Sequence, residues 1–260
     1  MEQRASVAYV QEVFRRKWLD DPEVIEEWKH LKEVTAKEII DQAAHLVYME
    51  FANQGDAAAM NCLAIDFGLG EGCEKDMEKE KYWSLRAANA GNLSAILRMG
   101  RHYSLGDIVE VDDAEAIKWY TKGIEMGSVE CQVELAEMYI YSNVRNVGKA
   151  IELFISAAAK GNVEAMYNLG KIYDNLNSGI EVYDEEKALY WYDAAARNGN
   201  KYAAEMKDIL QKSIKKHGYI GVNRNGFLRD DWVDISSERL KEQMKVMERQ
   251  SVDIGMGIEA

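Results

Sequence analysis

The side chains best suited to chemistry in this chain are its histidines and cysteines, and their spacing argues against a catalytic or metal centre. No two histidines stand in a metal-ligand pattern such as His-Glu-x-x-His, and no two cysteines form a Cys-x-x-Cys pair. No Ser/His/Asp or Cys/His arrangement can be argued from their positions either. We therefore expect no metal, no cofactor and no enzymatic activity. The residues are His30, His45, His102, His217, Cys62, Cys73 and Cys131.

The segment Gly68-Leu69-Gly70-Glu71-Gly72 is a second candidate for chemistry, because the backbone N–H groups of a glycine-rich loop can cradle a phosphate. It follows a predicted helix, however, and lacks the lysine of a phosphate-binding loop. We interpret it as a flexible loop between two helices.

The charge of the chain limits its partners. It carries 45 acidic and 32 basic residues, a formal net charge of −13, with 47% hydrophobic and 30% charged residues. This composition is typical of a globular protein, and the acidic sum argues against nucleic-acid binding, which needs basic charge. No stretch is long and apolar enough to span a membrane. The N-terminus lacks a signal-peptide pattern, so together with the odd cysteine count we expect a cytoplasmic protein.

The acidic charge is unevenly distributed. Residues 211–250 hold nine basic and six acidic side chains, so the excess of acid lies in residues 1–210. Two interpretations stay open: a solvated surface that keeps the protein soluble, or a surface that attracts a basic partner.

The secondary structure that positions these side chains can be predicted from an internal repeat in the sequence. Five glycines recur at intervals of 36, 36, 34 and 38 residues. Four positions after each glycine stands a small residue; in the first four units Leu or Met follows at position 8, Ala or Gly at position 9 and an aromatic residue at position 12. A second bulky apolar or aromatic group stands seven or eight residues before the next glycine. The glycines are Gly55, Gly91, Gly127, Gly161 and Gly199.

Each repeat is predicted to be a pair of helices. The glycine suits the left-handed position that ends a helix, and the Asp, Asn or Ser after it is a good N-cap for the next one. Offsets of 4, 8, 9 and 12 build one apolar stripe at helical spacing. Gly100 and Gly170 stand where other repeats have Ala64 and Ala136, which predicts a close approach of the paired helix. One hairpin cannot bury its own apolar face, so the pairs must stack.

These residues resemble the Sel1-like repeat, the cousin of the tetratricopeptide repeat. Its pattern is Ala-x-x-x-Leu-Gly-x-x-Tyr, a glycine-rich loop, then Asp-x-x-Lys-Ala-x-x-Trp-Tyr-x-x-Ala-Ala-x-x-Gly-Asn, and the unit at 161–200 matches it best. The resemblance covers about residues 55–210 and implies an all-α fold: a right-handed superhelical solenoid of four to five repeats. The matching residues are Ala165, Leu169, Gly170, Tyr173, Asp184, Lys187, Ala188, Trp191, Tyr192, Ala195, Ala196, Gly199 and Asn200.

The chain departs from the pattern in its third repeat and at its ends. The loop at 141–147 is short and lacks glycines, and the chain has none of the regular cysteine pairs of the cysteine-rich relatives. Residues 1–54 are predicted to form a helical N-terminal cap, with a helix start at Asp21-Pro22-Glu23. Residues 211–260 form an extension, in which 219–228 is either a small hairpin or an ordered loop. Residues 237–249 form a short amphipathic helix that either docks on the solenoid or binds a partner.

The resemblance also implies a binding surface, because the first helix of each unit lines the concave face in tetratricopeptide-like stacks. The corresponding positions mix apolar, aromatic and charged side chains, which suits a protein or peptide partner. Packing between neighbouring helices is the alternative for the apolar ones. The predicted concave-face residues are Asn61, Ile65, Leu97, Arg101, Val133, Glu137, Tyr141, Tyr167, Lys171 and Asn175.

Family members are generally non-catalytic scaffolds and adaptors, so the resemblance implies a protein-binding adaptor. One alternative is a bacterial immunity or inhibitor protein whose acidic body neutralises a basic toxin such as a nuclease. The other is a regulatory subunit that forms a homodimer through the C-terminal helix.

Overall fold

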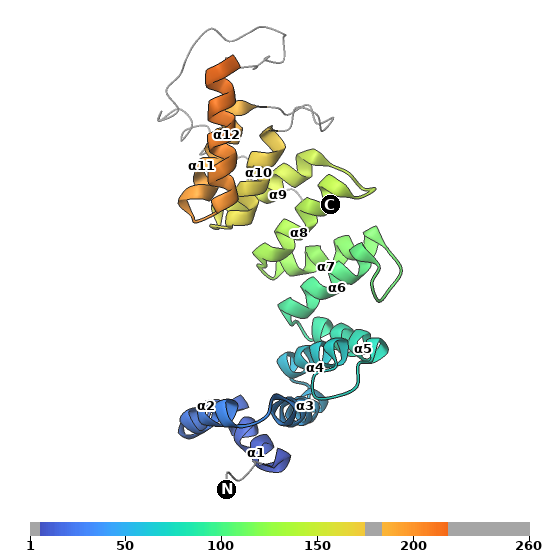
Figure 1. The fold of residues 1–260 in the computed structure, drawn as a ribbon. Coiled ribbons are helices and arrows are strands. Elements are labelled where there is room, and N and C mark those ends of the chain that lie inside the picture. The colour runs from blue at the N-terminus through green and yellow to red at the C-terminus, as the bar shows by residue number, and fades with distance from the viewer. Residues whose placement is uncertain (1–5, 175–183, 218–260) are drawn as a thin grey trace. The chain divides into compact units, whose positions relative to one another are not determined.

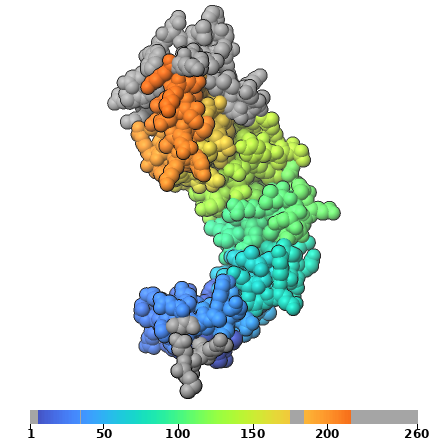
Figure 2. Space-filling model, in the orientation of Figure 1, coloured from blue at the N-terminus to red at the C-terminus, as the bar shows by residue number. Residues whose placement is uncertain are grey.

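The computed structural model describes residues 6–174 and 184–217, and the other residues are grey in the figures (Figure 1, Figure 2). The described part forms twelve α-helices, one short 3-10 helix and no strand, so the predicted all-α repeat fold is confirmed. The chain divides into two compact units, Met1–Met126 and Gly127–Ala260. The first contains α1 (Val7–Trp18), η1 (Pro22–Val24), α2 (Ile25–Val34), α3 (Lys37–Asn53), α4 (Ala57–Leu69), α5 (Met77–Asn89), α6 (Leu93–Leu105) and α7 (Asp113–Glu125). The second contains α8 (Val129–Tyr141), α9 (Val147–Ala159), α10 (Val163–Asp174), α11 (Glu185–Arg197) and α12 (Lys201–His217).

Each repeat consists of a first helix, here called the A helix, and a second helix, the B helix, packed against each other. The A helices are α4, α6, α8 and α10, and the B helices are α5, α7, α9 and α11. All five repeat glycines have φ between +86° and +100°, a region that glycine enters without steric cost. The residue after each glycine caps the following helix: Asn92, for example, accepts from the backbone N–H of Ala95 at 2.9 Å. The predicted left-handed glycines and the predicted N-caps of the repeat are therefore confirmed.

One contact sets the distance between the two helices of a repeat. On the A helix the contact is made by position 9, counted from the repeat glycine. On the B helix it is made by the residue that stands seven positions before the next repeat glycine. A Cβ on Gly100 would overlap the ring of Tyr120, and a Cβ on Gly170 would overlap the ring of Tyr192. Both rings are 1% exposed, so the predicted close approach is confirmed and its partner is a tyrosine ring.

The hydroxyl groups of these two tyrosines contact side chains that stand at the same position of the repeat. Tyr120 Oη lies 3.3 Å from Ser104 Oγ, and Tyr192 Oη donates to Asp174 Oδ2 at 3.2 Å. Ser104 and Asp174 both stand 13 residues after their repeat glycine. The other two repeats carry Phe154 or Ser84 at the ring position, and Ile140 or Gly68 at position 13. A polar side chain thus stands at position 13 only in the two repeats that carry Tyr120 or Tyr192.

The predicted N-terminal helices are present, and they continue into the stack. Asp21 caps η1 by accepting from the backbone N–H of Glu23, and α3 packs on both α1 and α4. In the second unit α12 packs on α11 and buries Ala203, Leu210 and Ile214. The loop or hairpin expected at 219–228 and the helix expected at 237–249 lie outside the described residues, and the three-part division at 54 and 210 stays a prediction.

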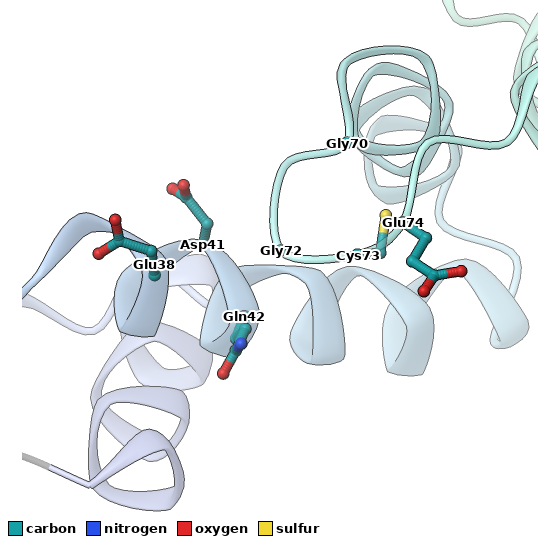
Figure 3. Close-up of a pocket in the computed structure, with 7 residues that line it drawn as sticks. All are labelled: Glu38, Asp41, Gln42, Gly70, Gly72, Cys73 and Glu74. Carbon is teal, nitrogen blue, oxygen red and sulfur yellow. The ribbon is translucent and has the colours of Figure 1, made fainter.

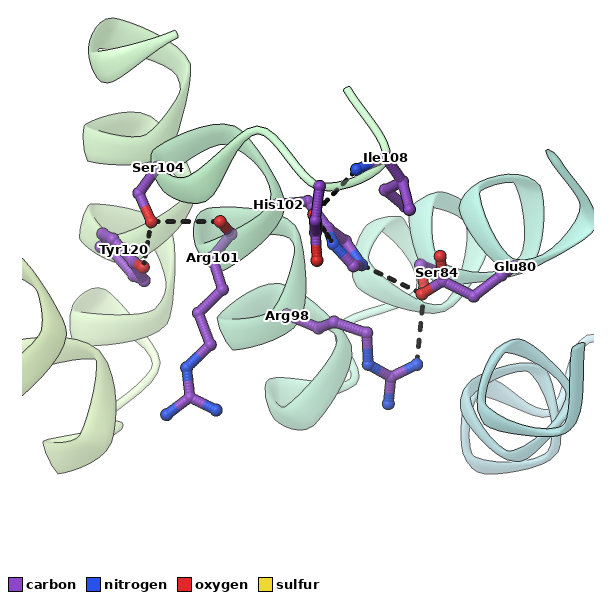
Figure 4. Close-up of polar contacts among 9 residues, drawn as sticks. Glu80, Ser84, Arg98, Arg101, His102, Ser104, Ile108 and Tyr120 are labelled. Carbon is purple, nitrogen blue, oxygen red and sulfur yellow. Dashed lines mark hydrogen bonds and ion pairs between the residues drawn. The ribbon is translucent and has the colours of Figure 1, made fainter. Parts of the chain in front are cut away.

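The first repeat departs from the pattern by burying a charged network. Glu80 occupies the position that holds Ala116, Ala150 and Ala188 in the other repeats, yet it is only 4% exposed. Gly68 makes room for it, because a Cβ there would lie 3.1 Å from Glu80 Cγ. Glu80 Oε1 lies 3.0 Å from His102 Nε2 and accepts from the Ser84 hydroxyl at 3.3 Å (Figure 4). Glu80 Oε2 is buried without a hydrogen-bond partner.

His102 joins this glutamate to the loop after α6. Its Nδ1 lies 2.7 Å from Asp107 Oδ1, so both ring nitrogens face carboxylates. Burial is the largest single influence and opposes protonation, but the hydrogen bonds and charges of Glu80 and Asp107 together outweigh it and raise the pKa of His102 above its usual 6.5. The protonated form satisfies both contacts, since only imidazolium donates from both nitrogens.

We predict that Gly170→Ala destabilises the second unit. The added methyl must displace the buried Tyr192 ring, and overpacking of this kind costs about 1–3 kcal/mol, more than the ~1 kcal/mol of helix propensity that alanine gains over glycine. Urea unfolding followed by circular dichroism measures the change. Gly148→Ala is the matched control, because that glycine lies in α9 with no side chain or backbone atom closer than 3.6 Å to the new Cβ. Equal stability of the two variants would refute the ring contact.

We also predict a pH dependence carried by His102. Because its pKa is higher in the folded than in the unfolded chain, its contribution to stability is complete below about pH 6.5 and disappears as the pH rises through the folded pKa. The unfolding free energy of the wild type should therefore fall towards that of His102→Gln as the pH is raised above 6.5. His30→Gln, at an exposed position on α2, controls for the loss of one histidine. A constant difference between wild type and His102→Gln across this range would contradict the assignment.

Candidate protein-binding surface

The candidate surface in each unit is the row of A-helix positions 6, 10 and 14, counted from the repeat glycine, which we call the A-helix face. These positions are four residues apart and therefore share one side of a helix. Position 14 is the most open of the three. Its apolar members Leu69, Leu105 and Tyr141 are 67%, 71% and 73% exposed.

Leu69 and Leu105 are surface residues that the sequence reasoning missed. It selected Tyr141 and Asn175 at position 14 but passed over the two leucines, which stand at the same offset in the first two repeats. Each is the last residue of its helix, followed by a glycine in the left-handed conformation, Gly70 or Gly106. The repeat offset was the signal that would have found them.

In the first unit the A-helix faces of α4 and α6 lie side by side. Arg98, at position 7 of α6, donates from Nη2 to Asn61 Oδ1 on α4 at 2.8 Å. Ile65 is 38% exposed one turn further along α4, Leu97 is half-buried and Arg101 is exposed. Asn61 thus serves as a bridge between helices, whereas Ile65 and Arg101 have exposed side chains. The guanidinium groups of Arg98 and Arg101 lie on the same side of α6 (Figure 4).

The second unit repeats this bridge with different chemistry. Asn168, also at position 7, donates from Nδ2 of α10 to Glu137 Oε1 of α8 at 2.9 Å. Burial is the main cause of a raised pKa at Glu137, partly offset by that hydrogen bond, while Glu164 and Glu134 raise it further. Lys171 is exposed, and its Nζ lies 5.7 Å from the centroid of the Tyr167 ring, a cation–π distance.

Two of the predicted apolar positions in this unit contribute to packing. Val133 is 4% exposed and belongs to the core of the unit, so it presents no open surface. Tyr167 is half-buried, with its ring centroid 6.0 Å from that of Tyr192. Asn175 lies outside the described residues. The binding role of the other predicted positions stays a prediction.

The A helices of the two units differ in charge. With His102 left out of the sum, α4 and α6 carry Asp66, Arg98 and Arg101, a formal charge of +1. Asp66 is 7% exposed and 2.9 Å from His45 Nδ1, so the exposed charge of these two helices is cationic. The sequences of α8 and α10 carry five carboxylates and one lysine, a sum of −4. The charged residues of the second pair are Glu130, Glu134, Glu137, Glu164, Asp174 and Lys171.

The glycine-rich segment forms the wall of an open recess rather than a phosphate cradle. The recess lies between α3 and the loop after α4 (Figure 3). Gly72 has φ +69°, and any Cβ there would overlap the carbonyl of Asp41. Lys37 ties the two walls together through Asp41 at 2.6 Å and Glu71 at 3.0 Å. The lining residues are Glu38, Asp41, Gln42, Gly70, Gly72, Cys73 and Glu74, so its charged side chains are acidic and unsuited to a phosphate.

Residues 6–174 and 184–217 contain no candidate metal-binding cluster and no candidate membrane-spanning helix. Within them, no three side chains of the His, Cys, Asp and Glu types meet in a way that could hold a metal ion. No helix of this part of the chain combines the length and the apolar character that crossing a membrane requires.

Comparison with known proteins agrees with this architecture. Two curated relatives are Chitin synthase regulatory factor 4 of Schizosaccharomyces pombe and the ERAD-associated E3 ubiquitin-protein ligase component HRD3 of Candida glabrata. The first is 27% identical over 135 residues, which cover 50% of this chain and 20% of the relative. The second is 29% identical over 108 residues, covering 42% and 12%. The chain therefore spans a fifth or less of the length of these relatives.

A solved structure shows the same fold. The Sel1 repeat protein from Oxalobacter formigenes is 30% identical and superimposes with a TM-score of 0.54, covering 65% of this chain and 49% of that one. The family model described as Sel1 repeat matches this chain four times in tandem, at residues 57–92, 93–128, 129–162 and 163–200. These matches span more than half of the sequence and agree with the helix pairs in the structure, and on this basis the chain belongs to the Sel1 repeat family.

Proposed function

We propose that this chain is a non-catalytic scaffold or adaptor that binds a protein or peptide through its A-helix faces. The observation that carries the proposal is the exposure of Leu69, Leu105 and Tyr141 at one repeat position. Large apolar side chains that recur in register on a surface are typical of a contact site, whereas single exposed apolar residues are ordinary.

The neighbouring side chains support a protein partner. The A-helix faces combine these apolar groups with arginine, lysine, glutamate and tyrosine, and interfaces are enriched in aromatic residues and arginine. Proteins of this family typically act through protein–protein contacts. The two curated relatives are named as a regulatory factor and a ligase component, roles that suit proteins acting by contact.

The runner-up, an immunity or inhibitor protein that neutralises a basic toxin, is supported by one feature. The A helices of the second unit sum to −4 and would attract a basic partner. A dimeric regulatory subunit would depend on residues 237–249, which lie outside the described residues. A cytoplasmic location also remains part of the proposal, supported by Cys62, Cys73 and Cys131, which form no disulfide with one another.

We predict that Arg101→Ala combined with Tyr141→Ala removes partner binding without unfolding the chain. Both side chains are exposed on A-helix faces, so their loss takes away contact groups and little packing. Affinity capture with the tagged chain, followed by mass spectrometry, identifies the partner, and titration with the purified partner measures the loss, which we expect to be tenfold or more.

The matched control removes the same types of side chain from B helices. Tyr82→Ala combined with Lys118→Ala removes one tyrosine and one cation at exposed positions nine residues before the next repeat glycine. It should leave affinity unchanged. Equal loss in both double variants would place the binding site elsewhere, and binding that falls steeply with salt would favour the basic-toxin alternative.

A further inference from the structure

The A-helix face of the first unit has a charge opposite to that of the chain. The protein carries a net charge of −13, yet α4 and α6 present no exposed carboxylate. Their one acid, Asp66, is buried against His45. The two cations, Arg98 and Arg101, lie on the same side of α6 (Figure 4).

Arg98 is a partly buried cation without a carboxylate in contact. Its described hydrogen bonds go to the neutral oxygens of Asn61 at 2.8 Å and Ser84 at 3.4 Å, and it forms no ion pair with any described residue. A guanidinium has five N–H donors, so three remain unused by these bonds. Burial is the main cause of a lowered pKa at Arg98, while the nearby charge of Glu80 works against the shift. Desolvating a cation is costly unless an anion compensates it.

The same face carries an apolar row beside these cations. Ile65 and Leu69 lie one turn apart on α4, and Leu105 follows Arg101 by one turn on α6. Leu69 and Leu105 are each at least two-thirds exposed. Contact between α4 and α6 through Asn61 and Arg98 makes the row and the cations parts of one surface.

We propose that the A-helix face of α4 and α6 binds a short extended peptide segment that carries leucine-like side chains next to aspartate or glutamate. The carboxylates pair with Arg98 and Arg101, and the apolar side chains cover Ile65, Leu69 and Leu105. This inference rests on the proposed protein-binding function and names the chemistry of the partner. It assigns the first unit an acidic ligand, opposite to the basic partner that the total charge suggests.

The chemistry favours a peptide over other anions. A carboxylate accepts two parallel N–H bonds from a guanidinium, which adds directionality to the charge attraction. Nucleic acids bring a continuous phosphate chain but no aliphatic side chains for the leucines. Neighbouring helices in such a stack lie about 8–10 Å apart. A peptide in the extended polyproline II conformation has three residues per turn and advances about 9 Å over them, so apolar side chains three residues apart lie on one face of the peptide and match the two leucines.

The test uses the full chain and a synthetic twelve-residue peptide, acetylated and amidated, with leucines three residues apart and glutamates between them. Fluorescence anisotropy measures its affinity against that of a counterpart in which lysine replaces every glutamate. We expect the glutamate peptide to bind at least tenfold tighter, and its affinity to fall with salt.

Variants assign the binding to this face. Leu69→Ser with Leu105→Ser, and separately Arg98→Gln, should each weaken binding of the glutamate peptide tenfold or more. Because Arg98 also bridges two helices, Arg101→Gln provides a second test at an exposed position. Leu85→Ser, on the exposed side of α5 in the same unit, is the matched control and should bind as the wild type does. Circular dichroism confirms that each variant is folded.

Several outcomes would overturn the inference. Equal affinity for the glutamate and lysine peptides would contradict the inference, and so would wild-type affinity in the leucine and Arg101 variants. A twelve-nucleotide oligodeoxythymidine that binds as tightly would assign the face to nucleic acid. A dimer in sedimentation that the leucine variant abolishes would assign it to a second copy. If the peptide fails while Arg101→Ala with Tyr141→Ala still abolishes partner capture, only this inference falls; if that variant also keeps its partner, the proposed function falls with it.

Discussion

The structure depends on how closely two helices of one repeat can approach. In two repeats, position 9 of the A helix meets a ring on the B helix, at the residue seven before the next glycine. Where the B helix brings a tyrosine, the A helix has no side chain, as in Gly100 with Tyr120 and Gly170 with Tyr192. Phe154 corresponds to Ala136 and Ser84 to Ala64. A packed interior tolerates little change in volume, so the glycine and the tyrosine ring occur together at this contact.

The first repeat has no ring at this contact and carries a different interior. With Ser84 in place of a ring and Gly68 beside it, the space accommodates Glu80, which other repeats replace with alanine. The glutamate reaches His102 of the next A helix, and Ser84 reaches Arg98 on the same helix. Buried charges are costly unless paired. Glu80 is paired with His102, whereas Arg98 is connected to this cluster only through the neutral hydroxyl of Ser84. The small side chain of Ser84 therefore connects this interior to Arg98, one of the two cations of the A-helix face of the first unit.

The second unit has Ala150 and Ala188 at the position of Glu80 and makes its polar contacts elsewhere. Tyr192 hydrogen-bonds Asp174, and Asn168 bridges to Glu137 between A helices. The same repeat position 7 holds Arg98 in one unit and Asn168 in the other, and both reach the preceding A helix. One backbone frame thus supports a cationic face with exposed leucines on one unit and an acidic, tyrosine-containing face on the other.

The sequence by itself determined the repeat, its helix pairs and the reason for Gly100 and Gly170, because glycine punctuation, capping residues and helical spacing act over a few residues. It also located the exposed positions Ile65, Arg101 and Tyr141. Only the tertiary structure decided that Val133 is core, that Asn61 is bonded to Arg98, and that Leu69 and Leu105 stand open. Exposure depends on which neighbouring helix covers a position. The Glu80–His102 pair, 22 residues apart, was likewise visible only once two repeats were stacked, since a contact between helices has no signature in the local pattern.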